Sequence, residues 1–162
     1  MNWYAVYTRA RHEKRVEQRL VEKNFETFLP LVEHTRVRKG RRFISQLPLF
    51  PNYLFVRSSP ERLMRAYWTP GVIRILGSEP EKPTPVPDAQ IEKIKLALEN
   101  KLRLDPYPYL KEGQRVRVKY GPLAGLEGIL LKRKKNLRLV ISIDLIARSA
   151  ICDISADDVE PV

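Results

Sequence analysis

The chain has 162 residues, enough for one ordinary domain or two small ones. With 43% hydrophobic residues and a mean hydropathy of −0.37, the composition excludes a wholly disordered chain, and no apolar run approaches the ~20 residues of a membrane-spanning helix. Thirty Lys and Arg against nineteen Asp and Glu leave a net charge of +11, which favours polyanions or acidic protein surfaces as partners.

Residues that carry catalysis or bind metals are sparse. The one cysteine, Cys152, cannot form an internal disulfide, and the two histidines give no Cys/His cluster with zinc-ligand spacing. The sequence has no phosphate-binding glycine loop and no paired-carboxylate motif. We therefore expect no catalytic residue, no metal and no cofactor. Arg9 and Arg11 interrupt the amino terminus before a signal-peptide core could form, so we expect a cytoplasmic protein, and a monomer by default.

The first hundred residues predict an alternation of strands and amphipathic helices. Residues 3–7 are aromatic and aliphatic, which is typical of a strand, and residues 11–23 place Val16 and Leu20 on one stripe of a charged helix. The other expected elements are a hairpin with arms 28–38 and 42–47, strands at 49–56 and 72–76, a short helix after Ser59-Pro60-Glu61, and a helix at 88–102 capped by Asp88. This order describes an α+β domain with a mainly antiparallel sheet flanked by helices.

Two proline clusters compete as the domain boundary, one at residues 80–87 and one at 106–108. The helix between them needs a surface to pack on. Because the residues after Tyr109 already describe a complete β unit, we assign this helix to the first domain. The expected domains are residues 1–100 and 111–162, joined by a flexible linker at 101–110.

The second part predicts a small β-barrel. Residues 115–119 alternate between valine and a basic residue, which places the valines on one face. Glycine and proline interrupt residues 121–128, and short strands are expected at 129–132, 137–143 and 149–154. Several short strands joined by turns are typical of a small barrel of the SH3-like kind.

Two motifs in this order resemble a known family. Residues 3–7 (WYAVY) before a charged helix, residues 48–56 (PLFPNYLFV) and residues 69–72 (TPGV) resemble the amino-terminal domain of the NusG family of transcription elongation factors. Residues 121–128 (GPLAGLEG) resemble that family's KOW motif. The resemblance implies a non-catalytic elongation and antitermination factor. Residues 142–148 lack the glycine expected in general NusG proteins, which resembles specialised paralogues such as the RfaH- and UpxY-like antiterminators.

The resemblance also implies that the first domain binds RNA polymerase at the clamp helices of its largest subunit. The positions that match an exposed apolar patch are Tyr7, Phe50, Pro51, Tyr53 and Phe55. The alternative is a core role, since strand alternation turns at most half of these side chains to the surface. The short helix at 60–66 is expected to reach the opposite lobe of the polymerase, so that the closed clamp is favoured and pausing is suppressed.

Basic residues are the candidate contacts to DNA of the transcription bubble. Five of the seven residues at 36–42 are basic, at the expected hairpin tip, and each cation bound to a phosphate releases counterions. Other candidates match family positions on the first helix and on the loop before the last strand. The full set is Arg9, Arg19, Lys23, Arg36, Arg38, Lys39, Arg41, Arg42 and Thr69. The alternative is a solvated basic surface.

In the second domain, Leu123 and Leu126 match the loop with which family members contact either Rho or a small-subunit ribosomal protein. The alternative for both is the barrel core. β-branched residues such as Val140 and Ile151 favour strands here over the helical resting form of RfaH's second domain. Two other functions stay open: a general NusG protein that acts with Rho, and a ribosomal or RNA-binding KOW protein.

Overall fold

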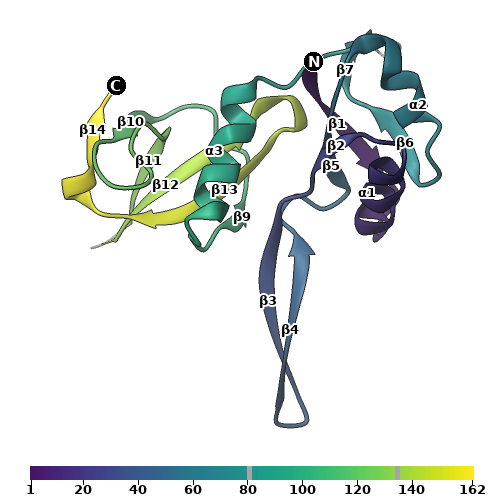
Figure 1. Cartoon of the computed structure of the whole chain (residues 1–162). Helices are drawn as coiled ribbons and strands as arrows, with labels where there is room; N and C mark the ends of the chain where they lie inside the picture. Colours follow the sequence, from purple (N-terminus) through teal and green to yellow (C-terminus); the bar gives the residue numbers. More distant parts are fainter. Residues whose placement is uncertain (80–81, 134–135) are drawn as a thin grey trace. The chain divides into compact units, whose positions relative to one another are not determined.

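The computed structural model describes residues 1–79, 82–133 and 136–162, and its contacts divide the chain into two units, Met1–Val86 and Pro87–Val162 (Figure 1). Each unit has its own sheet and its own apolar cluster. No helix among the described residues is long and apolar enough to cross a membrane. Pro80, which belongs to the first proline cluster, lies outside the described residues.

The first unit is built on a four-stranded antiparallel sheet with the order β2-β5-β1-β6. Its strands are β1 (Asn2–Thr8), β2 (Glu26–Phe28), β5 (Tyr53–Ser58) and β6 (Val72–Ile75). Tyr7 lies opposite Tyr53 in the register of β1 and β5, and Val6 lies opposite Leu54. Because side chains alternate along a strand, Tyr7 and Tyr53 share one face of the sheet and Val6 and Leu54 share the other. The strands predicted at 3–7 and 72–76 are confirmed.

Both helices of the first unit pack on the face that carries Val6. They are α1 (Glu13–Glu22) and, after the 3₁₀ turn η1 (Pro60–Arg62), α2 (Leu63–Tyr67). Val16 and Leu20 of α1 and Leu63 of α2 are buried in one cluster with Tyr4 and Val6 of β1. Full burial of a Val or Leu side chain stabilises the fold by about 1.5–3 kcal/mol. The opposite face of the sheet, with Tyr7 and Tyr53, carries no helix of this unit among the described residues.

A long hairpin leaves the first unit as a two-stranded ribbon, which Figure 1 shows extending away from the four-stranded sheet. Its strands are β3 (Leu31–Arg38) and β4 (Arg41–Pro48), and a shorter pair is formed by β7 (Gly77–Glu79) and β8 (Lys82–Pro83). Lys39 and Gly40 make the turn with φ of 52° and 74°, as a type I′ hairpin turn requires. Every residue from 33 to 47 is exposed. The predicted hairpin is confirmed, and it has no core of its own.

The second unit contains a six-stranded antiparallel sheet with the order β14-β10-β11-β12-β13-β9. The strands are β9 (Asp105–Tyr107), β10 (Gln114–Val118), β11 (Glu127–Arg133), β12 (Asn136–Ile143), β13 (Arg148–Ile154) and β14 (Val159–Pro161), with 3₁₀ turns η2 (Asp144–Ile146) and η3 (Ala156–Asp158). Val116 and Val118 are buried while the alternating cations are exposed, as the sequence pattern predicts. This sheet agrees with the predicted small β domain.

The helix predicted at 88–102 is α3 (Asp88–Glu99), and the structure groups it with the second unit. Its Gln90 Nε2 donates to Asp144 Oδ2 at 3.0 Å, and its Oε1 accepts from the backbone N–H of Asp144 at 3.1 Å. Asp88 is the first residue of the helix, and the capping position is held by Pro87. An apolar stripe predicts that a helix is buried but not which surface buries it. The contacts of α3 group it with residues 87–162, whereas the sequence analysis assigned this helix to the first domain.

The segment predicted to be a flexible linker is folded onto the second unit. β9 pairs with the edge of β13, and Leu104 just before it is buried. Tyr109 Oη donates to Asp144 Oδ1 at 2.7 Å. Proline has no N–H for the ladder, but Pro106 lies in an edge strand, where that loss is tolerated. The proline cluster at 106–108 is therefore compatible with the strand β9.

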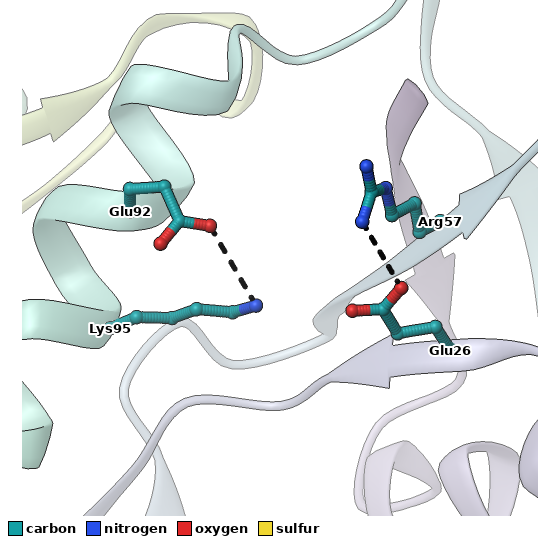
Figure 2. A network of polar contacts seen from close by, with 4 residues as sticks. All are labelled: Glu26, Arg57, Glu92 and Lys95. Carbon is teal, nitrogen blue, oxygen red and sulfur yellow. Dashed lines mark hydrogen bonds and ion pairs between the residues drawn. The ribbon is translucent and has the colours of Figure 1, made fainter. Parts of the chain in front are cut away.

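Surface ion pairs occur in both units (Figure 2). Arg57 of β5 lies 3.5 Å from Glu26 of β2, its neighbour in the register. Lys95 and Glu92 lie 3.9 Å apart along α3. Such exposed pairs contribute about 0–1 kcal/mol each, so the buried clusters dominate the stability of the fold.

Candidate functional site

The five residues matched to polymerase binding lie on, or next to, the face of the first sheet that its helices leave bare. Tyr7 and Tyr53 meet across β1 and β5 with ring centroids 5.3 Å apart. Phe55 stacks on Phe28 of β2 at 6.1 Å. Phe50 and Pro51 precede β5 in a turn. The structure thus places Tyr7, Tyr53 and Phe55 on one face of the sheet, with Phe50 and Pro51 in the turn that leads into it, and these five residues are here called the row.

Most of this row is covered in the whole chain. Phe55 is 0% exposed, Phe50 1% and Tyr53 7%. Tyr7 is partly exposed, and Pro51 is exposed. Phe50 and Phe55 are thus buried in the whole chain, although no helix of the first unit covers their face of the sheet among the described residues. The part of the row that reaches the surface is its edge at Tyr7 and Pro51.

Asn52 holds Pro51 beside the end of β1. Its φ of 74° lies in the left-handed region, which asparagine tolerates better than most residues. The backbone N–H of Thr8 donates to Asn52 O at 2.8 Å, and Asn52 Nδ2 donates to Thr8 O at 3.2 Å. The guanidinium of Arg74 lies 5.5 Å from the Tyr7 ring centroid, within cation–π range. This edge therefore combines an aromatic ring, a proline and a cation.

The loop before β6 is braced from α1. Arg19 Nη1 donates to Pro70 O at 2.7 Å. Lys23 Nζ donates to Thr69 Oγ1 at 3.0 Å and to Arg65 O at 3.1 Å. Thr69 itself is buried. Three of the predicted nucleic-acid contacts, Arg19, Lys23 and Thr69, are thus engaged within the protein, where they fix the shape of the loop.

This loop forms one wall of an open surface pocket, which is also lined by Arg9, Tyr67 and Trp68. The backbone N–H of Arg9 donates to Gly71 O at 2.9 Å, while its side chain is exposed. Trp68 is 72% exposed and meets Tyr67 edge-on at 5.1 Å. A cation beside open aromatic rings suits a nucleic-acid strand, since bases stack on aromatic faces and phosphates bind cations.

The sequence analysis gave the short helix at 60–66 a role but named no side chain for it, and the structure places Met64 of α2 and Trp68, directly after α2, on the surface. The sequence does contain a pattern that indicates these exposed side chains. The apolar stripe of this short helix is complete with Leu63 and Ala66, so large apolar residues beyond that stripe have no place in the core.

The hairpin carries the other predicted cations. Arg36, Arg38, Lys39, Arg41 and Arg42 are all exposed. No acidic residue occurs from 34 to 47, so the positive charge near the tip of the ribbon is not balanced by its neighbours along the strands. The hairpin tip is therefore available to a polyanion.

Comparison with known proteins decides the family. The model of the family described as "Transcription termination factor nusG" matches residues 1–95, more than half of the chain. The chain belongs to the NusG family. A NusG transcription termination/antitermination protein of Pseudomonas aeruginosa is 25% identical over 99% of this chain and 98% of its own length. Its counterpart in Buchnera aphidicola is 28% identical over 98% of this chain and 94% of its own.

A solved structure supports the fold. The structure titled "Domain interaction in Thermotoga maritima NusG" aligns with 99% of this chain and 97% of its own, with a TM-score of 0.56 and 21% identity. This chain thus has the fold of a NusG-family protein, and its relatives are transcription termination and antitermination factors.

In the KOW motif of this NusG-family chain, the two predicted leucines differ in exposure. Leu126 is buried, and its backbone N–H donates to Leu123 O at 2.9 Å. Leu123 is partly exposed. Of the two predicted leucines, only Leu123 therefore reaches the surface of this turn.

Metal ligands and the cysteine thiol are the remaining groups of chemical interest. Within the described ranges, no group of three or more His, Cys, Asp or Glu could hold a metal ion. Cys152 is buried in β13, and burial raises the pKa of its thiol to about 11. Since the thiolate is the reactive form, this cysteine is inert at neutral pH.

Proposed function

We propose that this chain is a non-catalytic transcription elongation and antitermination factor that binds RNA polymerase through its first domain and suppresses pausing. Membership of the NusG family supports this role. The observation that carries the polymerase contact is the apolar edge of the first unit, where Tyr7 and Pro51 reach the surface beside Arg74. Aromatic and arginine side chains are common anchors of protein interfaces.

This edge binds the clamp helices of the largest polymerase subunit. Tyr53 supports the Tyr7 ring, and Phe50 and Phe55 hold the turn and strand that carry the edge. Truncating a buried phenylalanine costs about 3–5 kcal/mol of stability, so Phe55→Ala would weaken polymerase binding through misfolding. The specific test is Tyr7→Ala, which should fold normally and yet no longer bind the polymerase.

The exposed side of α2, with Met64 and Trp68, reaches the opposite lobe of the polymerase. A bridge between two lobes exists only when the clamp is closed. Binding therefore shifts the population of polymerase away from open, paused states, by an amount set by the difference in affinity for the two states. This bridge is the proposed mechanism of pause suppression.

DNA of the transcription bubble binds to the basic surfaces of the first unit. Arg9 provides the cation of the pocket in which Trp68 and Tyr67 offer ring faces. The cations of the hairpin, at residues 36–42, provide a second contact. The bonds of Arg19 and Lys23 to the loop keep the pocket in shape.

The KOW domain recruits a second machine through Leu123, either a small-subunit ribosomal protein or Rho. The missing glycine at 142–148 favours a specialised antiterminator of a few operons over a general NusG protein. Genome-wide occupancy distinguishes the two, since a general factor follows all transcribed genes. The protein acts in the cytoplasm as a monomer.

One observation favours an RNA-binding KOW protein instead. Arg115, Arg117 and Lys119 point outward in a row that ends at the exposed Tyr120. Arg117 Nη2, however, donates to Glu127 Oε1 at 3.0 Å, and this bond holds the pKa of that carboxyl below its usual value. The row is therefore partly neutralised. Retention of the chain on purified polymerase after RNase treatment excludes this alternative, and its loss supports it.

In vitro transcription on a template with a defined pause tests the proposed function. The account predicts shorter pause lifetimes with the full chain, and smaller effects with Tyr7→Ala and Met64→Ala. Unchanged pause lifetimes at a saturating concentration of the wild-type chain would rule out the bridge.

A further inference from the structure

The β3–β4 hairpin presents two chemically different faces. Residues directly opposite each other in a two-stranded ribbon lie on the same side. The register pairs Arg36 with Phe43 and Arg38 with Arg41, so these four side chains form one face, here called the arginine face. It holds three guanidinium groups and one aromatic ring near the tip of the hairpin.

The reverse face is mixed, with two aliphatic side chains, one hydroxyl and one cation. It is formed by the pairs of Val37 with Arg42 and of Thr35 with Ile44. Ile44 is 68% exposed and Phe43 is 53% exposed, so neighbouring residues place one large apolar side chain on each face. Only the arginine face, however, combines a π surface with a cluster of cations.

Two features of the arginine face are unfavourable for the hairpin by itself. Arg38 and Arg41 lie directly opposite each other at the tip, and like charges in that position destabilise a ribbon. The Phe43 ring packs on no second layer, because every residue from 33 to 47 is exposed. Both features become favourable when a polyanion neutralises the guanidinium groups and a flat apolar group covers the ring.

We propose that the arginine face binds single-stranded nucleic acid, with one base stacked on the Phe43 ring and with Arg36, Arg38 and Arg41 on the adjoining phosphates. Stacking requires a base whose faces are open, which a single strand offers and a duplex does not, since its bases cover one another. The inference rests on the proposed contact to bubble DNA and deepens it, because it assigns the hairpin to the unpaired strand.

Fluorescence anisotropy of a labelled 12-nucleotide dT oligonucleotide, titrated with the full chain, tests this assignment. Phe43→Ala should weaken binding by about 5- to 150-fold, the range that corresponds to the loss of one base–aromatic stack. The matched control is Ile44→Ala, which removes the neighbouring exposed side chain from the reverse face and should leave the affinity within about twofold. Phe43→Trp should restore binding. Each titration is repeated in a Trp68→Ala background, because the pocket at Trp68 is a second place for a base.

The salt dependence of the affinity distinguishes the contribution of the Phe43 ring from that of the arginines. Each phosphate contact on a single strand contributes about 0.7 to the slope of log K against log salt. Arg38→Ala should lower that slope by about this amount, whereas Phe43→Ala should change the affinity and leave the slope as it is. Equal losses in Phe43→Ala and Ile44→Ala, or a duplex that binds as tightly as the single strand and is unaffected by Phe43→Ala, would overturn the proposal.

Retention on polymerase keeps this inference distinct from the proposed function. Phe43→Ala should be retained by core polymerase as well as the wild type, because Phe43 lies on the hairpin and not at the Tyr7 edge. If the wild type binds polymerase but no single strand at low salt, the hairpin assignment fails and the polymerase contact stands. If it binds the single strand but no polymerase, the proposed function fails and the hairpin assignment stands.

Discussion

Gly71 is the residue on which the geometry of the candidate pocket depends most sharply. Its φ of +98° lies in a region that side chains rarely adopt, and a Cβ built on it would lie 2.6 Å from Val16 Cγ2 in the buried cluster. The backbone strain of a non-glycine residue costs about 1–3 kcal/mol. Forcing a methyl group into a packed core costs a further ~1–3 kcal/mol. Gly71→Ala should therefore destabilise the first unit by about 2–6 kcal/mol, a large part of the ~5–15 kcal/mol typical of a domain.

Urea unfolding followed by tryptophan fluorescence measures this cost. Both tryptophans, Trp3 and Trp68, belong to the first unit, so the signal reports on that unit alone. The control is Gly40→Ala on the hairpin, where φ is +74° and nothing lies within 4 Å of the added Cβ. This control carries the same kind of backbone cost, about 1–3 kcal/mol, without the clash.

A double variant locates the clash. Val16→Ala removes the methyl group that the new Cβ would strike, so Gly71→Ala should cost less in that background by about 1–3 kcal/mol. Gly71→Ala could destabilise the chain no more than Gly40→Ala, or its loss of stability could be the same with Val16 and with Val16→Ala. Either result would contradict the close packing of the loop on α1.

Three further predictions concern the second unit. Cys152 should resist thiol reagents at pH 8, because a pKa of about 11 leaves on the order of a thousandth of it as thiolate; rapid labelling of the folded chain would contradict its burial. The hydrogen bond to Asp144 raises the pKa of Tyr109, so this contact is fully present below the ordinary tyrosine pKa and is lost as pH rises through the raised value. Asp144→Asn should return the absorbance titration of Tyr109 toward its usual range. An unchanged titration would speak against the hydrogen bond. Leu126→Ala should lower stability by about 2–5 kcal/mol in thermal unfolding followed by circular dichroism, whereas the stability of Leu123→Ala should stay within ~0.5 kcal/mol of the wild type. Similar losses of stability in the two variants would show that both leucines belong to the core.

Local elements were predictable where a period or a turn signal was strong. The alternation of residues 3–7 and the stripe of Val16 and Leu20 correspond to β1 and α1. The Lys39-Gly40 turn needs two positive φ angles, which the glycine marks in the sequence. These features depend on neighbours in the chain, so the sequence alone carries them.

Features that depend on distant contacts were not predictable. The stripe of α3 indicates burial, but its hydrogen bonds to Asp144 join residues far apart in the sequence. Phe55 and Tyr7 both match the family patch, yet only Tyr7 lies at an edge that reaches the surface. Alternation assigns residues to faces, and the packing of other segments decides which face is covered. For the same reason Arg19 looked like a free cation until its bond to Pro70 was seen.

The affinity of the full chain for nuclease-treated core RNA polymerase tests the central claim most directly. The comparison is between Tyr7→Ala, at the edge proposed to bind the clamp helices, and Tyr120→Ala, an exposed tyrosine of the second unit. The account predicts a loss of about 30-fold or more for Tyr7→Ala, as for an interface anchor worth ~2 kcal/mol, and an unchanged affinity for Tyr120→Ala. Wild-type affinity in a folded Tyr7→Ala variant would contradict it.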